Sequence, residues 1–455
     1  KRFLHTEELF KKITWKPFFK IADYENGRAY SSDEFGVEGG IKVSKIGDVT
    51  NKRLIANWET LSYSEFNSQK GTKLVEDDIL MSLTGDPPDV GKVNLVSNIT
   101  EPATFNQRVA RVFLRHTQSD FISAKVFFAV LANRHCREQL ERFAKGVRQR
   151  NLGIECLELL KIPIFKDDFQ RLIDSLIIKS FEQSKIQQTK YQQAEALLLS
   201  ELGLKDWQPS EANTAEVSLV DSFLSSGRLD AEYYQPKYEA IYNHLGKSNT
   251  SAINKEFDVL RGRNFNYYED GEVKVIKTKQ VTRRNCLKFD VDDRTSLIEV
   301  KNERLILLQE QDIVFASMGR GSLGKASIFY AEQSDERLTI DSTLRVFRIK
   351  ENSQTLPEVA FVWINSDVCY DIILRYEIGT TGITSLYEND INNIIFPILP
   401  EDIQVEISNF VRQSQTAQTK SKRLLALAKE AVEIAIEQSE EAAEKIIFSS
   451  LANLE

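Results

Sequence analysis

Two short segments have the residue types of a nucleotide-binding loop. GRGSLGKA at 319–326 has the glycine and lysine spacing of a phosphate-binding loop that follows a strand. Ala326, however, replaces the Ser or Thr that would bind magnesium. The similar segment GDPPDVGKV at 85–93 contains two prolines, which lack the backbone N–H groups that hold phosphate oxygens. The pattern therefore favours a glycine turn, with Lys92 or Lys325 beside it, over a nucleotide site.

A second segment is similar to the signature of adenine methylases. It reads Asp86-Pro87-Pro88-Asp89, but that signature ends in an aromatic residue that stacks on a flipped base. Asp89 cannot stack in this way. The glycine-rich segment at 36–40 is expected in a loop and not between a strand and a helix, where a cofactor glycine motif would lie. We therefore expect no methyl transfer by this chain alone.

Acidic residues in the second half faintly resemble a metal-dependent nuclease core. Glu299 and Lys301 lie downstream of Asp290, Asp292 and Asp293, and carboxylates with a lysine can hold magnesium and position water. The first half has no counterpart, so an acidic loop is the commoner explanation. The four histidines lack the spacing of zinc ligands, and no catalytic triad is readable. The sequence predicts a protein without a catalytic centre, metal or cofactor of its own, with a nuclease as an alternative.

Length and composition predict a soluble globular protein with two or three domains. The chain has 455 residues, of which 42% are hydrophobic and 28% charged, with a net charge of −8. No apolar run is long enough to span a membrane, and the first residues do not resemble a signal peptide. The four cysteines are scattered, which is typical of reduced thiols in a cytoplasmic protein.

The strongest pattern is an internal repeat. IKVSKIGDVT (41–50) recurs as VKVIKTKQVT (273–282), DDILMSLTGDPPDVGKV (77–93) as QDIVFASMGRGSLGKA (311–326), KIPIFKDDFQRLIDSLI (161–177) as IFPILPEDIQVEISNFV (395–411), and Arg111-Val112-Phe113 as Arg345-Val346-Phe347. The matches keep the same order, and each pair is separated by 232 to 234 residues. A period this long does not fit a solenoid, so we expect one structural unit that has been duplicated.

Each half is expected to be a mixed α/β (α+β) domain followed by a long helix. Short β-branched runs predict strands, and one internal helix is expected in each half, at 127–143 and 360–376. The predicted divisions are a first domain at 1–165, a first long helix at 166–204, a linker and opening helix at 205–245, a second domain at 246–400, and a second long helix with an acidic tail at 401–455.

The two long helices are expected to pair as an antiparallel coiled coil. Apolar residues follow alternating steps of four and three, which is the spacing of a coiled-coil seam. The predicted seam comprises Ile173, Ile177, Tyr191, Ala194 and Leu198 on the first helix, and Ile407, Val411, Leu425, Ala428 and Val432 on the second. Its middle is polar in both copies, with Ser and Gln at the seam positions. The alternative is that each helix packs only on its own domain.

This duplicated arrangement resembles the DNA-specificity subunit of Type I restriction–modification systems. The supporting residues are Leu229-Asp230-Ala231-Glu232-Tyr233-Tyr234, Asp78-Ile79 and Asp312-Ile313, Gly91-Lys92 and Gly324-Lys325, and the Asn151-Leu152 and Ser385-Leu386 steps that precede the helices. The resemblance covers essentially the whole chain. It implies two target-recognition domains that each read half of an asymmetric, bipartite site in double-stranded DNA.

The resemblance also implies partners that supply the chemistry. Two methyltransferase subunits would dock on the helices and use S-adenosylmethionine, and restriction/translocase subunits would use ATP and magnesium. This chain would be non-catalytic and would bind no membrane. Two alternatives stay open: the specificity subunit of another bipartite-site restriction system, and a structural coiled-coil adaptor that binds no DNA.

Polar and basic residues in equivalent places of the two halves are the candidate DNA contacts. Arg and Gln suit guanine and adenine edges, while Thr suits phosphates and thymine methyl groups. The first candidates are Arg148, Gln149 and Arg150 in the first half and Thr380, Thr381 and Thr384 in the second. The further candidates are Lys42, Lys45, Lys92, Lys274, Lys277, Arg283, Arg284, Arg320 and Lys325.

Overall fold

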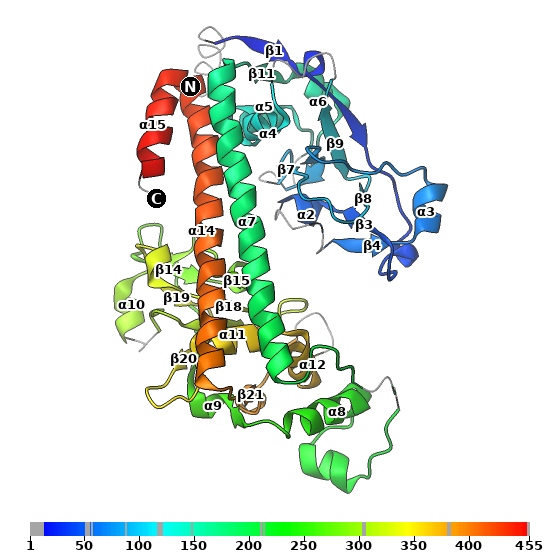
Figure 1. The fold of residues 1–455 in the computed structure, drawn as a ribbon, viewed down its shortest axis with the longest axis vertical. Helices are drawn as coiled ribbons and strands as arrows, with labels where there is room; N and C mark the ends of the chain where they lie inside the picture. Colours follow the sequence, from blue (N-terminus) through cyan, green and yellow to red (C-terminus); the bar gives the residue numbers. More distant parts are fainter. Residues whose placement is uncertain are drawn as a thin grey trace. The chain divides into compact units, whose positions relative to one another are not determined.

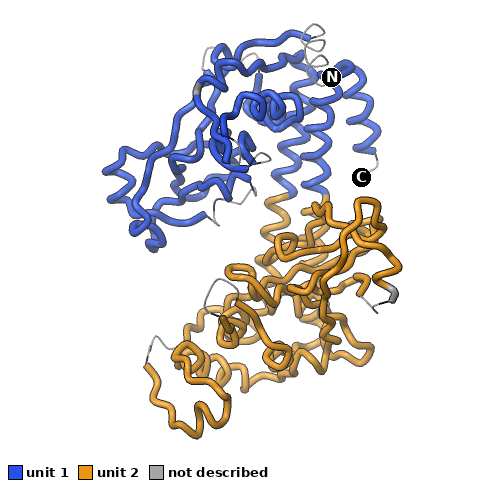
Figure 2. Tube along the Cα trace, turned by 180° about the vertical axis from the view of Figure 1, so that it is seen from behind, with its two compact units in different colours: residues 1–183, 420–455 blue, residues 184–419 orange. Residues whose placement is uncertain are grey.

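The chain folds into two compact units. The structure, a computed structural model, describes residues 13–50, 55, 58–86, 89–115, 122–146, 149–209, 212, 214–302, 306–379 and 384–452 (Figure 1). Unit 1 comprises residues 1–183 with 420–455, and unit 2 comprises residues 184–419 (Figure 2). Each of the two long helices therefore contributes one part to each unit.

Unit 1 is built around two sheets. A four-stranded antiparallel sheet has the order β2 (Ala22–Asn26), β9 (Val109–Leu114), β5 (Ile79–Ser82), β7 (Val93–Leu95), and a three-stranded sheet has the order β4 (Glu59–Leu61), β3 (Ile41–Ser44), β8 (Ala103–Phe105). The smaller elements are β1 (Trp15–Pro17) paired with β11 (Lys161–Pro163), β6 (Thr84–Gly85) paired with β10 (Arg150–Asn151), η1 (Phe18–Lys20), η2 (Ser32–Glu34), α2 (Ile46–Thr50), α3 (Tyr63–Ser68) and α6 (Ile154–Leu159).

Unit 2 repeats this plan. A five-stranded sheet has the order β13 (Phe257–Arg261), β20 (Leu344–Ile349), β17 (Ile313–Ala316), β18 (Ala326–Ile328), β15 (Asn285–Cys286), and a three-stranded sheet has the order β16 (Arg294–Thr295), β14 (Val273–Ile276), β19 (Arg337–Ile340). The smaller elements are β12 (Thr250–Ala252) paired with β21 (Ile395–Pro397), η5 (Val220–Leu224), η6 (Ala231–Tyr234), α8 (Pro236–Leu245), α9 (Ile253–Glu256), η7 (Thr278–Gln280), α10 (Leu297–Asn302), η8 (Ala331–Gln333) and α13 (Glu388–Asn392).

The single inner helix expected in each half is two helices. In unit 1 they are α4 (Ala124–Ala132) and α5 (Arg134–Phe143), and in unit 2 they are α11 (Pro357–Asn365) and α12 (Asp367–Arg375). The expectation was wrong because a capping residue interrupts each helix. The side chain of Asn133 accepts a hydrogen bond from the Cys136 N–H at 3.0 Å, and Ser366 caps α12 in the same way.

Strand pairing shows how closely the two units correspond. In unit 1, Ile79 of β5 pairs with Val112 of β9. In unit 2, the equivalent Ile313 of β17 pairs with Phe347 of β20. Val112 is therefore equivalent to Phe347 and not to Val346, so the expected match between the two Arg-Val-Phe segments is one residue out of register. The strand positions that follow from this pairing determine which residues are compared below.

The two long helices are α7 (Asp167–Glu201) and α14 (Glu401–Glu437), and they pack together in an antiparallel pair (Figure 1). In unit 1 the Ser180 hydroxyl donates to the Ser421 carbonyl oxygen at 2.9 Å. In unit 2 the Ser414 hydroxyl donates to the Gln187 carbonyl oxygen at 2.8 Å. The polar middle of the seam thus hydrogen-bonds across the pair. The domain divisions expected from the sequence stay predictions, because the compact units divide both helices.

Most of the expected seam is buried. Ile173, Ile177, Ala428 and Val432 belong to the core of unit 1, and Tyr191, Ala194, Leu198, Ile407 and Val411 belong to the core of unit 2. Leu425 is only partly buried, whereas Leu424 and Leu427 beside it are buried. Both cores also contain sheet and inner-helix residues, so the long helices pair with each other and pack on the domains at once.

Equivalent glutamines, Gln170 and Gln404, connect each long helix to an inner helix. In unit 1, Gln170 of α7 accepts a hydrogen bond from the Ser123 N–H, the residue before α4. In unit 2, Gln404 of α14 accepts one from the Leu356 N–H at 2.9 Å, the residue before α11. The sequence therefore uses one side chain in each copy to position the inner helix on the long one.

The acidic tail forms a further helix, α15 (Glu440–Ala452). Figure 1 shows it folded back beside α14. Ala443 and Ile447 of α15 are buried in the core of unit 1, and the carboxylate of Glu440 accepts a hydrogen bond from the Lys166 N–H at 3.2 Å. The tail thus helps to cover the core of this unit. Among the described residues, no helix has the length and hydropathy needed to cross a membrane.

Candidate nucleic-acid interface

Four segments of unit 1 meet where strands of the four-stranded sheet begin and end. The Leu83 N–H donates to the Arg108 carbonyl oxygen at 2.9 Å, and the Leu152 N–H donates to the Leu83 carbonyl oxygen at 2.8 Å. The Gln107 N–H donates to the Arg28 carbonyl oxygen at 2.9 Å. We call residues 27–28, 83–85, 106–108 and 149–152 the loop cluster of unit 1.

Unit 2 has a loop cluster in which two of these three backbone hydrogen bonds recur. The Ser317 N–H donates to the Thr343 carbonyl oxygen at 3.0 Å, and the Leu386 N–H donates to the Ser317 carbonyl oxygen at 3.0 Å. The Gly319 N–H donates to the Thr384 carbonyl oxygen at 2.8 Å. The loop cluster of unit 2 therefore comprises residues 262–263, 317–320, 341–343 and 384–386.

Each loop cluster contains a glycine followed by an arginine, Gly27-Arg28 in unit 1 and Gly262-Arg263 in unit 2. A Cβ added to Gly27 would lie 2.1 Å from the Asn106 carbonyl oxygen, and one added to Gly262 would lie 1.9 Å from the Asp341 carbonyl oxygen. Only glycine allows the two backbones to approach this closely. The following residues, Arg28 and Arg263, are exposed. The sequence interpretation missed this element, although the repeated Gly-Arg dipeptide was available as a signal.

The clusters contain the loops that were expected first as DNA contacts. Gln149 is exposed, while the Arg150 guanidinium donates to the Glu141 carbonyl oxygen at 2.7 Å and is held at the end of α5. Thr384 is buried, and its hydroxyl has no hydrogen-bond partner among the described residues. Arg148, Thr380 and Thr381 lie outside the described residues, so their roles stay predictions.

The glycine turns lie next to the clusters and lead into strands. Gly91 and Gly324 have φ angles of 73° and 79°, and each is followed by a lysine and then by β7 or β18. A phosphate-binding loop would lead into a helix instead. Lys92 pairs with Asp89 at 2.6 Å, Lys325 is partly buried, and Arg320 is exposed. Of these three candidates, Arg320 is the most accessible to DNA.

The four lysines that lie on β3 and β14 or directly after them already have partners. Lys42 lies 3.8 Å from Glu101, and Lys45 pairs with Glu59. In unit 2, Lys274 pairs with Glu336, and Lys277 pairs with Asp293 at 2.9 Å and lies over the Tyr267 ring. The hydrogen bond to Asp293 is the main cause that raises the pKa of Lys277. A DNA phosphate would have to compete with these carboxylates.

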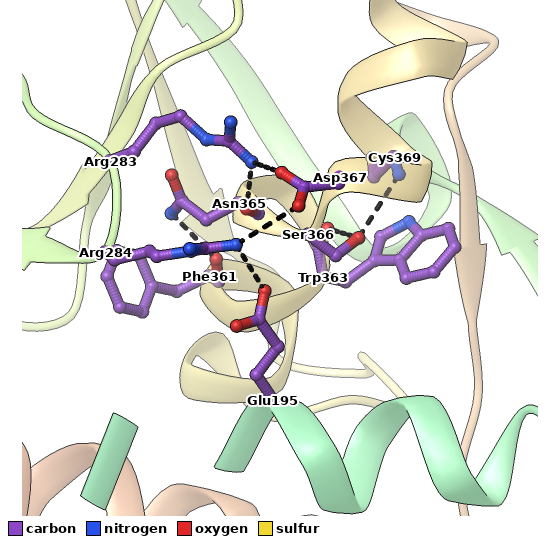
Figure 3. Close-up of polar contacts among 9 residues, drawn as sticks. All are labelled: Glu195, Arg283, Arg284, Phe361, Trp363, Asn365, Ser366, Asp367 and Cys369. Atoms are coloured by element: carbon purple, nitrogen blue, oxygen red, sulfur yellow. Dashed lines mark hydrogen bonds and ion pairs between the residues drawn. The ribbon is translucent and has the colours of Figure 1, made fainter. Parts of the chain in front are cut away.

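Arg283 and Arg284 take part in a polar cluster inside unit 2 (Figure 3). Arg284 donates to Glu195 of α7 at 2.9 Å and lies 3.6 Å from Asp367, and Arg283 donates to Asp367 at 2.7 Å. Burial raises the pKa of Glu195, although Arg284 opposes this shift. These contacts join the β15 loop to α7 and to the start of α12. Their function as phosphate contacts stays a prediction, but the visible function is structural.

The residues after this pair bind the second long helix. The Gln418 side chain donates to the Asn285 side-chain oxygen at 2.6 Å and accepts from the Cys286 N–H at 3.3 Å. Gln418 is one of the polar seam positions of α14. The polar middle of the seam therefore holds the β15 loop as well as the partner helix, which sequence spacing alone did not indicate. We call Arg283, Arg284, Asn285 and Cys286 the helix anchor of unit 2.

The carboxylates of the nuclease alternative do not converge in the described part of the chain. Glu299 accepts hydrogen bonds from Tyr268 at 2.7 Å and Asn266 at 3.0 Å, while Asp293 pairs with Lys277. No group of three or more His, Cys, Asp or Glu residues that could hold a metal ion occurs among the described residues. The arrangement gives no support to a metal-dependent cleavage site.

The first part of the chain matches a known family of protein domains. Residues 8–196 match the family described as the Type I restriction modification DNA specificity domain. Residues 8–196 are therefore similar to a Type I DNA specificity domain. The match includes the whole loop cluster of unit 1 and confirms the resemblance noted in the sequence. Unit 2 lies mostly outside the match, and its relation to the specificity domain rests on the internal repeat.

Solved structures of specificity subunits are similar over most of the chain. The S subunit of a Type I system from M. genitalium is 12% identical with a TM-score of 0.41, and the alignment covers 94% of this chain and 96% of that one. The HsdS subunit from Thermoanaerobacter tengcongensis is 11% identical with a TM-score of 0.30, covering 94% and 97%. No curated protein sequence matches the chain.

Proposed function

We propose that this chain is the DNA-specificity subunit of a Type I restriction–modification complex in the cytoplasm. Each unit would read one half of an asymmetric, bipartite site in double-stranded DNA through its loop cluster. The single observation that carries the proposal is the repeat of the loop cluster itself. Two backbone hydrogen bonds recur in both clusters, from Leu83 and Leu152 in unit 1 and from Ser317 and Leu386 in unit 2, while most of the side chains differ. Two half-sites of different sequence require a similar backbone arrangement in each unit and different side chains at the positions that contact the bases.

The chain would contribute recognition and no catalysis. Two methyltransferase subunits would dock on the long helices and bring S-adenosylmethionine, and restriction/translocase subunits would bring ATP and magnesium. The paired helices α7 and α14 support a structural role for this part of the chain, because residues of both helices are buried together in the core of each unit. A specificity subunit of another bipartite-site restriction system would share these features.

A binding and cleavage experiment separates this function from the other classes. The full chain is mixed with pooled random duplexes in a gel-shift assay, and the same mixture is then incubated with magnesium. We expect shifted complexes whose affinity falls steeply with salt, because phosphate contacts release counterions, and no cleavage. A structural adaptor would shift no DNA at any salt concentration. A nuclease would cut the duplexes in the absence of other subunits.

A further inference from the structure

The turn that follows β8 in unit 1 has a structural copy in unit 2. The Val109 N–H donates to the Asn106 carbonyl oxygen at 3.0 Å, and the Asn106 side chain accepts from the Arg108 N–H at 3.1 Å. In unit 2 the Leu344 N–H donates to the Asp341 carbonyl oxygen at 3.2 Å, and Asp341 also accepts from the Thr343 N–H. An Asn or Asp side chain thus fixes the same tight turn in both clusters.

The residues at the tips of these turns differ in length and polarity. Gln107 and Arg108 occupy the tip in unit 1, and Ser342 and Thr343 occupy the same two positions in unit 2. Gln107 and Arg108 are exposed, and neither side chain has a hydrogen-bond partner among the described residues. A long basic and a long amide side chain on a rigid, exposed turn are therefore available for a ligand.

The short side chains of unit 2 are already occupied. The Ser342 hydroxyl donates to the Asn264 side chain at 2.7 Å, and the Thr343 hydroxyl lies 3.0 Å from the Thr278 hydroxyl. The same two turn positions therefore have exposed side chains in unit 1 and side chains hydrogen-bonded to neighbouring residues in unit 2. The two units therefore differ in the side chains available for a ligand at these two turn positions.

Both loop clusters have an arginine beside the turn, Arg28 in unit 1 and Arg263 in unit 2. The Gln107 N–H binds the Arg28 carbonyl oxygen, and Arg263 has the equivalent place in unit 2. The Arg28 guanidinium has only loose contacts in the described part of the chain, 3.4 Å to the Lys70 carbonyl oxygen and 3.9 Å to Glu25. A residue kept in both units suits the phosphate backbone, which is the same in any sequence, whereas residues that differ suit the bases.

We propose that Gln107 and Arg108 determine the specificity of unit 1 by reading purines in the major groove of the first half-site, with Arg28 on an adjoining phosphate. The proposal rests on the DNA-recognition function above. Arg108 reads guanine, because a guanidinium matches the O6 and N7 acceptors, and Gln107 reads adenine through N6 and N7. Ser342 and Thr343 make no such contacts, so the second half-site has no matching purine pair at the equivalent positions.

The test is a selection from random duplexes by the full chain together with its methyltransferase partners. Wild type should select two short words, of which the first contains a guanine that depends on Arg108. Arg108→Ala should relax that position alone and weaken binding of the wild-type site on the order of 10- to 100-fold. Arg108→Lys keeps the charge but loses the paired hydrogen bonds, so it should also relax the guanine while retaining binding to other sequences.

Two matched variants separate reading from positioning. Thr343→Ala changes the equivalent tip in unit 2 and should leave the first word intact. Arg28→Ala should weaken binding to every sequence and reduce the salt slope by about one counterion. A wild-type chain that selects no sequence would contradict the proposed function. A wild-type chain that selects two words, with Gln107→Ala and Arg108→Ala leaving the first word unchanged, would overturn this inference and leave the function standing.

Discussion

The two loop clusters share part of their backbone hydrogen bonding and differ in most of their side chains. Their frames depend on interior contacts that are repeated, such as the hydrogen bonds of Leu83 and Ser317 to the turns. Their tips lie at the surface, where Gln107 and Arg108 correspond to Ser342 and Thr343. The comparison indicates that interior backbone hydrogen bonds position the turns, while the exposed residues at the tips of the turns differ between the units. The residues for which recognition is proposed therefore differ between the units.

The two units also differ in a buried ion pair, and substitutions in this ion pair should cause the largest losses of stability. Asp78 and the equivalent Asp312 are both buried, and each accepts a hydrogen bond from an arginine of the neighbouring strand. Arg111 makes one bond to Asp78, at 2.7 Å, whereas Arg348 makes two to Asp312, at 2.6 and 2.9 Å. The arginines stand at different strand positions, because Phe347 and not Val346 is equivalent to Val112.

Removing either arginine should strongly destabilise its own unit. Arg348→Ala and Arg111→Ala each leave a buried carboxylate unpaired, which costs about 3–5 kcal/mol, and Arg348 should lie at the upper end of this range. The measurement is the free energy of unfolding from denaturant titration of the full chain. Arg320→Ala, at an exposed site, is the matched control and should change little. Equal losses for the two arginines would contradict the ranking by hydrogen bonds.

Weakening the helix anchor of unit 2 should lower the free energy of unfolding by less than the loss of Arg111 or Arg348. Arg284→Ala removes the partner of Glu195, whose side chain is only 15% exposed, and should cost about 2 kcal/mol of unfolding free energy. Because Asp367 keeps its bond to Arg283, the cluster is weakened and not abolished. A stability within error of wild type, accompanied by a shallower salt slope for DNA binding, would show that Arg284 contacts phosphate instead.

The pH dependence of Glu195 sharpens this test. Burial raises the folded pKa of Glu195 above its ordinary value of 4.5. The folded state therefore binds the proton more tightly, and ionisation of Glu195 costs stability as the pH rises through the folded pKa. We expect wild type to gain stability relative to Glu195→Gln as the pH falls from neutral toward 4.5. A difference between the two proteins that is constant over this range would contradict the assigned burial effect.

The smallest losses of stability should come from removing the seam hydrogen bonds that Ser180 makes in unit 1 and Ser414 makes in unit 2. Ser180→Ala and Ser414→Ala each remove one bond to a carbonyl oxygen of the partner helix, which is worth about 1 kcal/mol. Thermal unfolding of the two variants should show similar small shifts. A large loss for one variant would show that the polar middle supports one unit more than the other.

The sequence predicted what regular spacing controls. The steps of four and three in α7 and α14 gave the helix pair, and the repeated segments gave the duplicated domain. The break at Asn133 was missed, because helix periodicity continues across it and only the capping bond reveals it. The register of β20 was also missed, since the identical Arg-Val-Phe segments suggested a match that strand pairing does not follow.

The candidate site was predicted only in part for a similar reason. Composition favours arginine-rich runs as DNA contacts and therefore predicts Arg283 and Arg284, although both form ion pairs with carboxylates of unit 2. Composition does not indicate Gln107 and Arg108, because a single arginine after a glutamine is not a basic run. Their importance comes from the turn fixed by Asn106 and from its copy at Asp341, which depend on contacts that are distant in the sequence.

The central claim is that each unit reads its own half of a bipartite site. The most direct measurement is the sequence of duplexes that the full chain and its methyltransferase partners select from a random pool at physiological salt. The account predicts two short, different words, separated by a spacer of constant length whose bases are unselected. One continuous word, or two words with identical sequence, would contradict the assignment of one half-site to each unit.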